Sequence, residues 1–458
     1  MTDPKGGHVL EDRIAEWRSY ARRRQAIHAV DLEELEDHLR SRVADLRKAG
    51  LDEEEAFLIG VKRLGELDTL SREFAREHSG RLWKRLVVAD TAAAGRGWNT
   101  EAWVALGLAI AAAVAIKLPA LFGMPIEDGG AAAQSFYMLN ASLFVLPFLT
   151  GFFAWKRGMK GAALARLATP FVVGALAVNL MPLVRGGSTE VLTALHLPMA
   201  LWFSVGVGYA GGAWRDQDQR MNFVRFTGEW FIYFVLIALG GGVLMGSTVL
   251  IFSAIGRNPE WLLNNWILPC GVMGAVVVAA WLVEAKQSVI ENMAPVLTLL
   301  FTPLFTLLLL AFLGTMLWTG TGIKVEREVL IGFDLLLVVV VGLLLYAISA
   351  RDPQAEPGFF DVLQFVLVVC ALLVDALALW AILARISAFG FSPNKVAALG
   401  ENLILVVNLA GSAVLYGRFL RKRAGFGRLE RWQTAYLPVY AVWAWIVVLV
   451  FPLVFRFR

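Results

Sequence analysis

Eleven long apolar runs after residue 100 constrain the fold of this chain more than any other feature of its sequence. Each run is long enough for an α-helix to cross the hydrocarbon core of a bilayer, which takes about 18 or more residues. Helices satisfy their own backbone hydrogen bonds, as a segment in lipid must. We therefore predict an all-α, polytopic transmembrane bundle with helices over residues 102–122, 134–155, 163–183, 191–212, 228–254, 264–283, 295–318, 329–349, 360–384, 396–417 and 435–455.

The distribution of charge divides the chain near residue 90. Residues 1–90 hold 36 of the 80 charged residues, whereas residues 91–458 hold the other 44. The high proportion of charged residues in 1–90 excludes a membrane span there. The low proportion in 91–458 excludes an ordinary soluble domain. We expect a small N-terminal helical domain over 1–90 and a transmembrane domain over 91–458. The first segment has no net positive charge, which argues against nucleic-acid binding.

Apolar residues of the first segment repeat at the spacing of a helix that buries one face. His38 lies within this region without a second His, Cys or carboxylate at metal-ligand spacing, so we assign it a packing or surface role. The clearest apolar series is Leu32, Leu35, Leu39, Val43 and Leu46.

Three stretches of this segment resemble the bacterial permease prefix domain, and the similarity covers residues 9–79. This resemblance implies a short cytoplasmic helical module placed ahead of multi-pass membrane segments. The stretches are Leu35-Glu36-Asp37-His38-Leu39 followed by Asp45-Leu46, then Gly50-Leu51-Asp52-Glu53-Glu54-Glu55-Ala56-Phe57, and Lys62-Arg63-Leu64-Gly65.

Parts of residues 135–420 resemble a bacterial multi-pass family known as domain of unknown function 4153. The resemblance implies a membrane protein and brings no reaction with it. It rests on the run from Leu146 to Arg157, on Phe301-Thr302-Pro303-Leu304, and on Arg385-Ile386 with Gly390-Phe391-Ser392-Pro393-Asn394-Lys395.

Lys and Arg residues predict the orientation, because short cytoplasmic loops carry an excess of them. Nineteen flank the helix ends on the side of the N-terminal domain, and nine flank the other ends. We expect a bacterial inner-membrane protein with a cytoplasmic N-terminus and an extracytoplasmic C-terminus. The basic cluster from Arg418 to Arg431 is either part of this topology signal or a binding site for anionic lipid.

Ionisable residues within spans are costly, so they are the first candidates for a functional site. Glu229, Glu284 and Asp361 lie near the predicted cytoplasmic ends, where we expect water to reach them. The more informative set lies in the outer half of the membrane. It comprises Lys117, Asn140, Asn179, His196, Asp334, Asp375, Arg385 and Glu401.

Three interpretations of this polar layer compete. In the first, Asp375 and Glu401 pair with Lys117 or Arg385 and hold helices together, since buried charges are paired or neutralised. In the second, the two carboxylates handle protons or cations in a transport cavity. In the third, the layer catalyses a reaction at the outer face, but the short outer loops carry no acidic metal-binding cluster.

Other sequence features narrow the function. We find no nucleotide-binding loop, zinc-protease motif or nucleophile elbow, and Cys270 and Cys370 fit no metal or disulfide pattern. We therefore expect no cofactor, no metal and no enzymatic activity. The glycines at 240–242 and Gly246 predict either a close helix contact or a point of unwinding.

The function that we expect is that of a membrane sensor or regulator, which acts through a cytoplasmic protein partner of residues 1–90. The alternative is a secondary transporter or channel for a small solute or ion that uses the outer polar layer.

Overall fold

The computed structural model divides the chain into two compact units, Met1–Gly97 and Trp98–Arg458. It describes residues 100–126, 129–254, 257–285, 293–320 and 327–457, together with seven residues of the first unit. Of these seven, Leu39 and Val43 are helical and buried, as expected for two members of one apolar helix face. The other predictions for residues 1–90, including the role of His38, lie outside the described residues.

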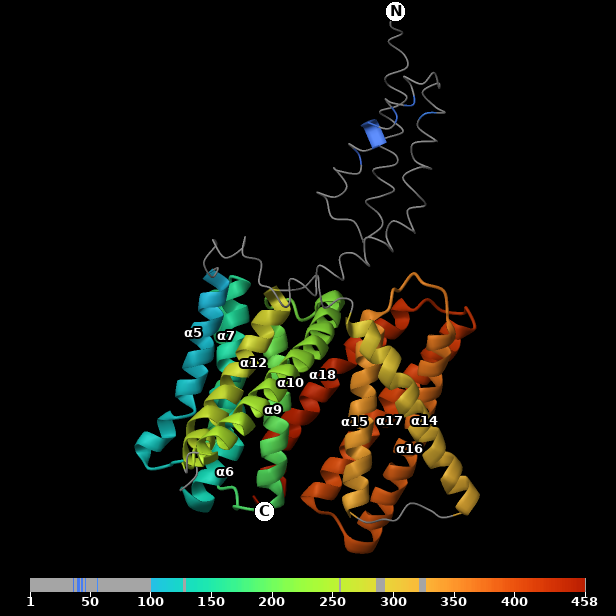
Figure 1. Ribbon diagram of the computed structural model, residues 1–458. Coiled ribbons are helices and arrows are strands. Elements are labelled where there is room, and N and C mark those ends of the chain that lie inside the picture. The colour runs from blue at the N-terminus through green and yellow to red at the C-terminus, as the bar shows by residue number, and fades with distance from the viewer. Residues whose placement is uncertain are drawn as a thin grey trace, which may run out of the picture. The chain divides into compact units, whose positions relative to one another are not determined.

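The described part of the second unit is all-α, and eleven of its helical segments are long and apolar enough to span a bilayer (Figure 1). The second span is interrupted by a short 3-10 turn ahead of Pro147, and the sixth contains a π-helical turn. The elements are α5 (Thr100–Ala115), η1 (Leu118–Phe122), α6 (Gly130–Asn140), η2 (Ala141–Phe144), α7 (Leu146–Lys156), α8 (Ala162–Leu180), α9 (Ser188–Tyr209), α10 (Gln217–Ala254), α11 (Glu260–Leu262), η3 (Leu263–Ile267), α12 (Leu268–Ala285), α14 (Met293–Thr319), α15 (Arg327–Ala350), α16 (Phe359–Phe389), α17 (Pro393–Leu420), α18 (Gly427–Leu449) and α19 (Phe451–Val454).

The prediction of an all-α protein with about eleven spans is confirmed for the described residues, and the chain is a multi-pass integral membrane protein. The largest difference in the predicted boundaries is at α10, which begins at Gln217 instead of residue 228. The added turns carry Asp218, Arg220 and Arg225. A span predicted from hydropathy leaves out such charged residues, so its predicted start was too late. The helix continues beyond the apolar run because nothing in those turns breaks it.

The helices of the second unit pack in two groups around separate apolar cores. The first core is centred on the rings of Phe152, Phe153 and Phe226 and involves α5, α7, α9, α10 and α12. The second, around Leu344 and Tyr416, involves α14, α15, α16 and α17. Helix α18 packs against both α9 and α17, so it joins the two groups. Figure 1 shows this helix running obliquely between them.

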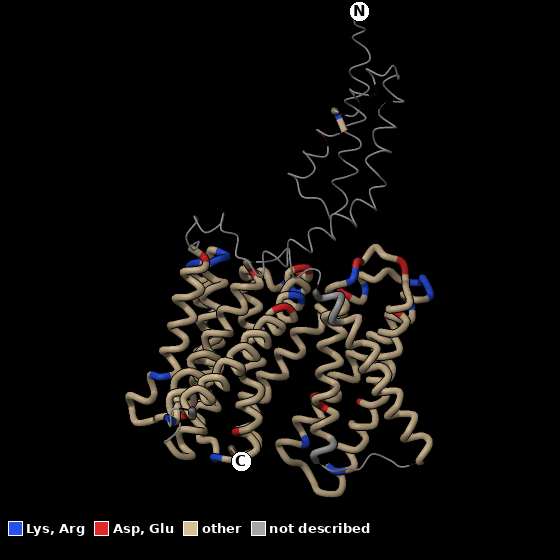
Figure 2. Tube along the Cα trace, in the orientation of Figure 1, with Lys and Arg blue, Asp and Glu red and all other residues tan. Residues whose placement is uncertain are grey.

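Charged residues gather at the two ends of the helices and leave an apolar middle zone (Figure 2). We call the end that carries Lys156, Arg351 and Arg421 the basic face, and the other end the opposite face. Helices α5, α8, α10, α14, α16 and α18 begin at the basic face. Many large apolar side chains of the middle zone are exposed, for example Val243 at 71% and Leu307 at 66%. In a spanning protein such side chains face lipid.

The glycines of α10 play neither of the roles that the sequence predicted. The helix runs unbroken from Gln217 to Ala254, so it does not unwind at Gly240. A Cβ atom built at Gly240, Gly241, Gly242 or Gly246 would meet no described atom within 4 Å, so these glycines make no close helix contact either. The prediction was wrong because small residues permit a close approach without requiring one.

A close approach does occur at Gly411, where α17 meets α18. A Cβ atom at this position would overlap Cζ2 of Trp432. The indole cannot move freely, because its Nε1–H donates a 3.1 Å hydrogen bond to the carbonyl oxygen of Asn408. The absence of a side chain at Gly411 therefore sets the distance between the two helices.

We predict that Gly411→Ala lowers the melting temperature of the purified protein in detergent. The added methyl group overpacks the contact with Trp432, which costs about 1–3 kcal/mol. Gly240→Ala is the matched control. It adds the same methyl group where no described atom is near, so the gain in helix propensity of about 0.5–1 kcal/mol should leave stability equal or higher. Equal effects of the two substitutions would contradict the packing at Gly411.

Candidate functional site

Seven of the eight polar residues predicted to share one layer separate into three groups in the structure. Asn140 bonds to Asn179, and Lys117 bonds to a backbone carbonyl group of η3. His196, Glu401, Asp334 and Asp375 form the third group, which lies between the two halves of the bundle. The third group is therefore the candidate functional site.

Several polar side chains of the spans satisfy one donor on their own helix. His196 bonds through Nδ1 to the carbonyl oxygen of Leu192 at 2.8 Å, four residues before it. Asn402 donates in the same way to Ala398 at 2.8 Å. These local bonds leave the other end of each side chain free to reach a neighbouring helix.

His196 of α9 and Glu401 of α17 form the first contact of the site. The Nε2 atom of His196 lies 2.7 Å from Oε1 of Glu401. Because Nδ1 faces a carbonyl oxygen, Nδ1 carries a hydrogen, and Nε2 either donates to a carboxylate or accepts from a carboxylic acid. The contact holds one proton in either arrangement. The Glu401 side chain is 33% exposed and the His196 side chain 7%.

Asp334 of α15 lies next to this pair. Its Oδ1 accepts a 2.8 Å hydrogen bond from Nδ2 of Asn402. Asp334 interacts electrostatically with both Glu401 and Asp375. Asp334 therefore connects the partly exposed end of the site with its buried end.

Asp375 is the most unusual residue of the site. It lies at the middle of α16, 16 residues after Phe359 and 14 before Phe389, which is about 21–24 Å from either helix end at 1.5 Å per residue. It is 0% exposed. Both of its carboxylate oxygens are buried and form no hydrogen bond to any described group. Helix α16 extends to Phe389, five residues beyond the end that the sequence predicted for this span.

Two further unpartnered polar atoms belong to residues of the same region. The Oδ1 atom of Asn402 and the hydroxyl of Tyr440 are buried without a hydrogen-bond partner among the described groups. Tyr440 of α18 interacts electrostatically with Asp375. The side chains of five helices, α9, α17, α15, α16 and α18, therefore follow one another as a chain of titratable groups. We call it the buried acidic chain; its members are His196, Glu401, Asp334, Asp375 and Tyr440.

The pairing of Asp375 and Glu401 with Lys117 or Arg385 is wrong. Lys117 donates from Nζ to the carbonyl oxygen of Asn265 at 2.5 Å, and it lies 4.6 Å from the ring centre of Trp266. Asn265 belongs to the π-helical turn η3, where the backbone pattern shifts and carbonyl groups are left for other donors. Arg385 has another interaction and forms no ion pair with Asp375 or Glu401.

Asn140 and Asn179 form a separate contact between the second and third spans. Their amides exchange two hydrogen bonds, of 3.2 Å and 2.8 Å. The hydroxyl of Ser135 bonds to the nearby buried Glu190, whose other oxygen accepts from the backbone N–H of Gly186 at 2.6 Å. These groups satisfy one another, so the contact is structural and lies outside the candidate site.

The sequence did not reveal a second polar cluster at the interface of α17 and α18. Asn408 and Gln433 exchange amide hydrogen bonds of 3.1 Å and 3.3 Å, and Gln433 also donates to Ser412 at 2.6 Å. Tyr436 donates to the carbonyl oxygen of Ile404 at 2.9 Å. We call Asn408, Ser412, Gln433 and Tyr436 the polar seam. The ring centres of Tyr436 and Tyr440 are 5.4 Å apart, so the seam adjoins the buried acidic chain.

The acidic residues near the basic face are buried and paired, which corrects the expectation that water surrounds them. Glu284 is 8% exposed and accepts a 2.8 Å ion pair from Lys156. Asp361 forms a two-point contact with Arg351, at 2.7 Å and 3.0 Å. Such bidentate pairs orient groups strongly. The Lys156–Glu284 pair joins the ends of α7 and α12, and the Arg351–Asp361 contact ties the segment after α15 to the first turn of α16.

The described residues contain no group of three or more His, Cys, Asp or Glu residues that could hold a metal ion. No family model, curated protein or solved structure matches this chain. The function must therefore be inferred from the geometry of the buried acidic chain and the polar seam.

We predict that Asn408→Leu and Gln433→Leu each lower the melting temperature, because each leaves the other amide buried and unpaired at a cost of about 1–3 kcal/mol. The double variant should lose less than the sum of the two single variants, because it removes both polar partners. The measurement is thermal unfolding in detergent. Thr248→Val, at a half-buried position of α10 outside the polar seam, serves as a control that should change little. Strict additivity would show that the two amides do not interact.

Proposed function

We propose that this protein is a secondary transporter coupled to proton movement, and that Asp375 is its proton-binding group. The observation that carries the proposal is a fully buried carboxyl group at mid-helix whose two oxygens have no hydrogen-bond partner among the described groups. An intramembrane acidic residue in such a position is typical of proton relays in pumps and transporters.

The physical argument starts from the cost of burying charge. An ionised carboxylate without partners in an apolar interior is so unfavourable that the group takes up a proton instead. The neighbouring Asp334 adds repulsion, because two carboxylates at close range do not ionise together easily. Asp375 is therefore neutral in this arrangement. It gives up its proton only when the surroundings change, which links proton transfer to a change in helix packing.

The remaining members of the buried acidic chain offer a route for the proton. Glu401 is partly exposed, and its contact with His196 holds a proton. Asp334 connects it electrostatically to Asp375. Beyond Tyr440, the amide and hydroxyl groups of the polar seam both donate and accept hydrogen bonds, as a relay toward the basic face requires.

The site supports transport better than regulation or catalysis. The regulator hypothesis depends on residues 1–90, of which the structure describes seven, so a cytoplasmic partner of that segment stays a prediction. The absence of enzymatic activity and the resemblances to the permease prefix domain and to domain of unknown function 4153 also stay predictions. In our proposal the basic face is cytoplasmic in a bacterial inner membrane, and the basic residues from Arg418 to Arg431 meet anionic lipid there.

The proposal predicts proton flux in liposomes that contain the purified protein and a pH-sensitive dye. A potassium diffusion potential or a pH gradient should drive protons through the wild-type protein faster than through protein-free liposomes. Asp375→Asn keeps the shape of the side chain but cannot exchange a proton, so its rate should fall to that of protein-free liposomes. The measurement is the initial rate of dye response.

Asp352→Asn is the matched control for the loss of a carboxylate. Asp352 is exposed at the basic face, and the acceptor that it offers to the backbone N–H of Gln354 is kept by Asn. This variant should transport at the wild-type rate. A full rate in folded Asp375→Asn, or wild-type rates equal to those of protein-free liposomes under both driving forces, would contradict the proposal.

A further inference from the structure

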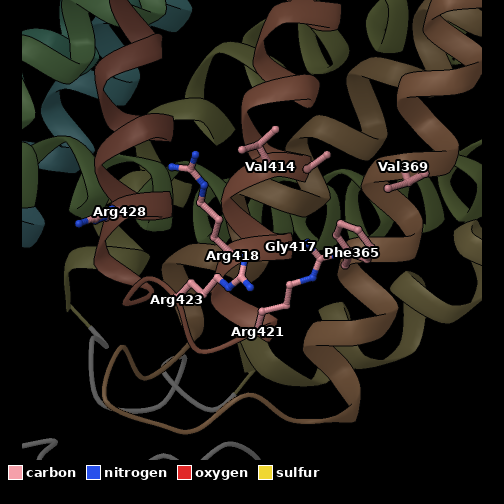
Figure 3. Close-up of a pocket in the computed structure, with 9 residues that line it drawn as sticks. Phe365, Val369, Val414, Gly417, Arg418, Arg421, Arg423 and Arg428 are labelled. Atoms are coloured by element: carbon pink, nitrogen blue, oxygen red, sulfur yellow. The ribbon is translucent and has the colours of Figure 1, made fainter.

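A cavity of about 500 Å³ lies at the basic face, between α16, the end of α17 and the beginning of α18. One part of its wall is apolar, and the other part carries arginine side chains (Figure 3). The loop from Arg421 to Phe426 connects α17 to α18 and contributes two of these arginines. The lining residues are Phe365, Val369, Ala413, Val414, Gly417, Arg418, Arg421, Arg423 and Arg428.

The four arginines of this cavity have no protein partner among the described residues. Arg418, Arg421, Arg423 and Arg428 form no side-chain hydrogen bond and no ion pair there. By contrast, the neighbouring Lys422 is paired with Glu356 at 2.9 Å, and this contact lowers the pKa of the Glu356 carboxyl group. Two of the other arginines near the basic face, Arg351 and Arg157, are likewise paired with carboxylates. The positive charge of the cavity is therefore left available for an anion.

The apolar part of the wall extends from the arginines into the spanning region. Ala413 and Val414 lie about two turns before Arg421 on α17, which corresponds to roughly 12 Å along the helix. Phe365 and Val369 line the cavity from the facing helix α16. Val414 is 55% exposed. An anion without an apolar part would leave this wall without a complementary surface.

We propose that this cavity binds one anionic phospholipid, with its phosphate among the four arginines and an acyl chain along the apolar wall. Guanidinium groups match phosphate oxygens in geometry and form charge-assisted hydrogen bonds with them. Basic pockets between spanning helices at the cytoplasmic side are suited to lipid headgroups. The apolar wall favours a lipid over inorganic phosphate. This site adds to the proposed transporter and does not depend on proton movement.

The test is native mass spectrometry of the delipidated, full-length protein titrated with phosphatidylglycerol, and separately with phosphatidylcholine and with inorganic phosphate. The wild-type protein should bind one phosphatidylglycerol at least about tenfold more tightly than phosphatidylcholine, because several surface arginines each favour anionic lipid. The variant Arg418→Gln/Arg421→Gln/Arg423→Gln should bind the two lipids equally.

The control variant removes three positive charges from the same face but outside the cavity. Lys160→Gln/Arg166→Gln/Arg215→Gln changes exposed residues that do not line it. This variant should keep the preference for phosphatidylglycerol. An equal loss of preference in the two triple variants would show that the attraction is that of the whole face, and it would overturn the site.

A second variant keeps all charges and so preserves the test if the arginine variant fails to fold. Ala413→Phe fills the apolar wall and should weaken phosphatidylglycerol binding severalfold, because the acyl chain loses its surface. Unchanged phosphatidylglycerol binding in Ala413→Phe would overturn the proposed lipid, as would wild-type binding of inorganic phosphate as tight as that of phosphatidylglycerol.

Discussion

The cost of an unpaired charge in an apolar interior governs the arrangement of this membrane domain. Three acidic residues of its spanning helices each have a direct partner: Glu284 has Lys156, Asp361 has Arg351, and Glu401 has His196. Asp375 has none among the described groups, although it is 0% exposed. In the proposed function, Asp375 is neutral in this arrangement and becomes ionised when the helix packing changes. The proposed function follows from this exception.

Helix α18 is also important for the proposed function, because it contributes to the surroundings of Asp375. This helix packs against α9 in one half of the bundle and against α17 in the other, and it carries Tyr440 next to Asp375. The same helix supplies Gln433 and Tyr436 to the polar seam. A movement of α18 between the two halves would change the surroundings of Asp375 and the seam together. Such coupling between packing and protonation is what a secondary transporter requires.

The spans were predictable because the need to satisfy the backbone in lipid leaves a strong signal in the sequence. The site was predictable only in part. The presence of ionisable residues in predicted spans identified Asp375, Asp334 and Glu401 as candidates. The partners of these side chains depend on how each helix is rotated about its own axis, which a single sequence does not reveal. Lys117 has the charge expected for a partner, yet it bonds to a carbonyl group of a π-helical turn. The polar residues of α18 that the sequence analysis missed do have a recognisable spacing. Gln433, Tyr436 and Tyr440 are spaced by three and four, so polar groups share one face of α18.

The protonation state of Asp375 is the central claim, and infrared spectroscopy measures it without knowledge of any transported solute. At neutral pH, the spectrum of the wild-type protein should contain the C=O stretching band of a protonated carboxylic acid that the spectrum of Asp375→Asn lacks. The spectrum of Asp352→Asn should keep this band. If wild-type protein and Asp375→Asn show the same carboxylic acid band at neutral pH, Asp375 is ionised, and its assignment as the proton-binding group is wrong.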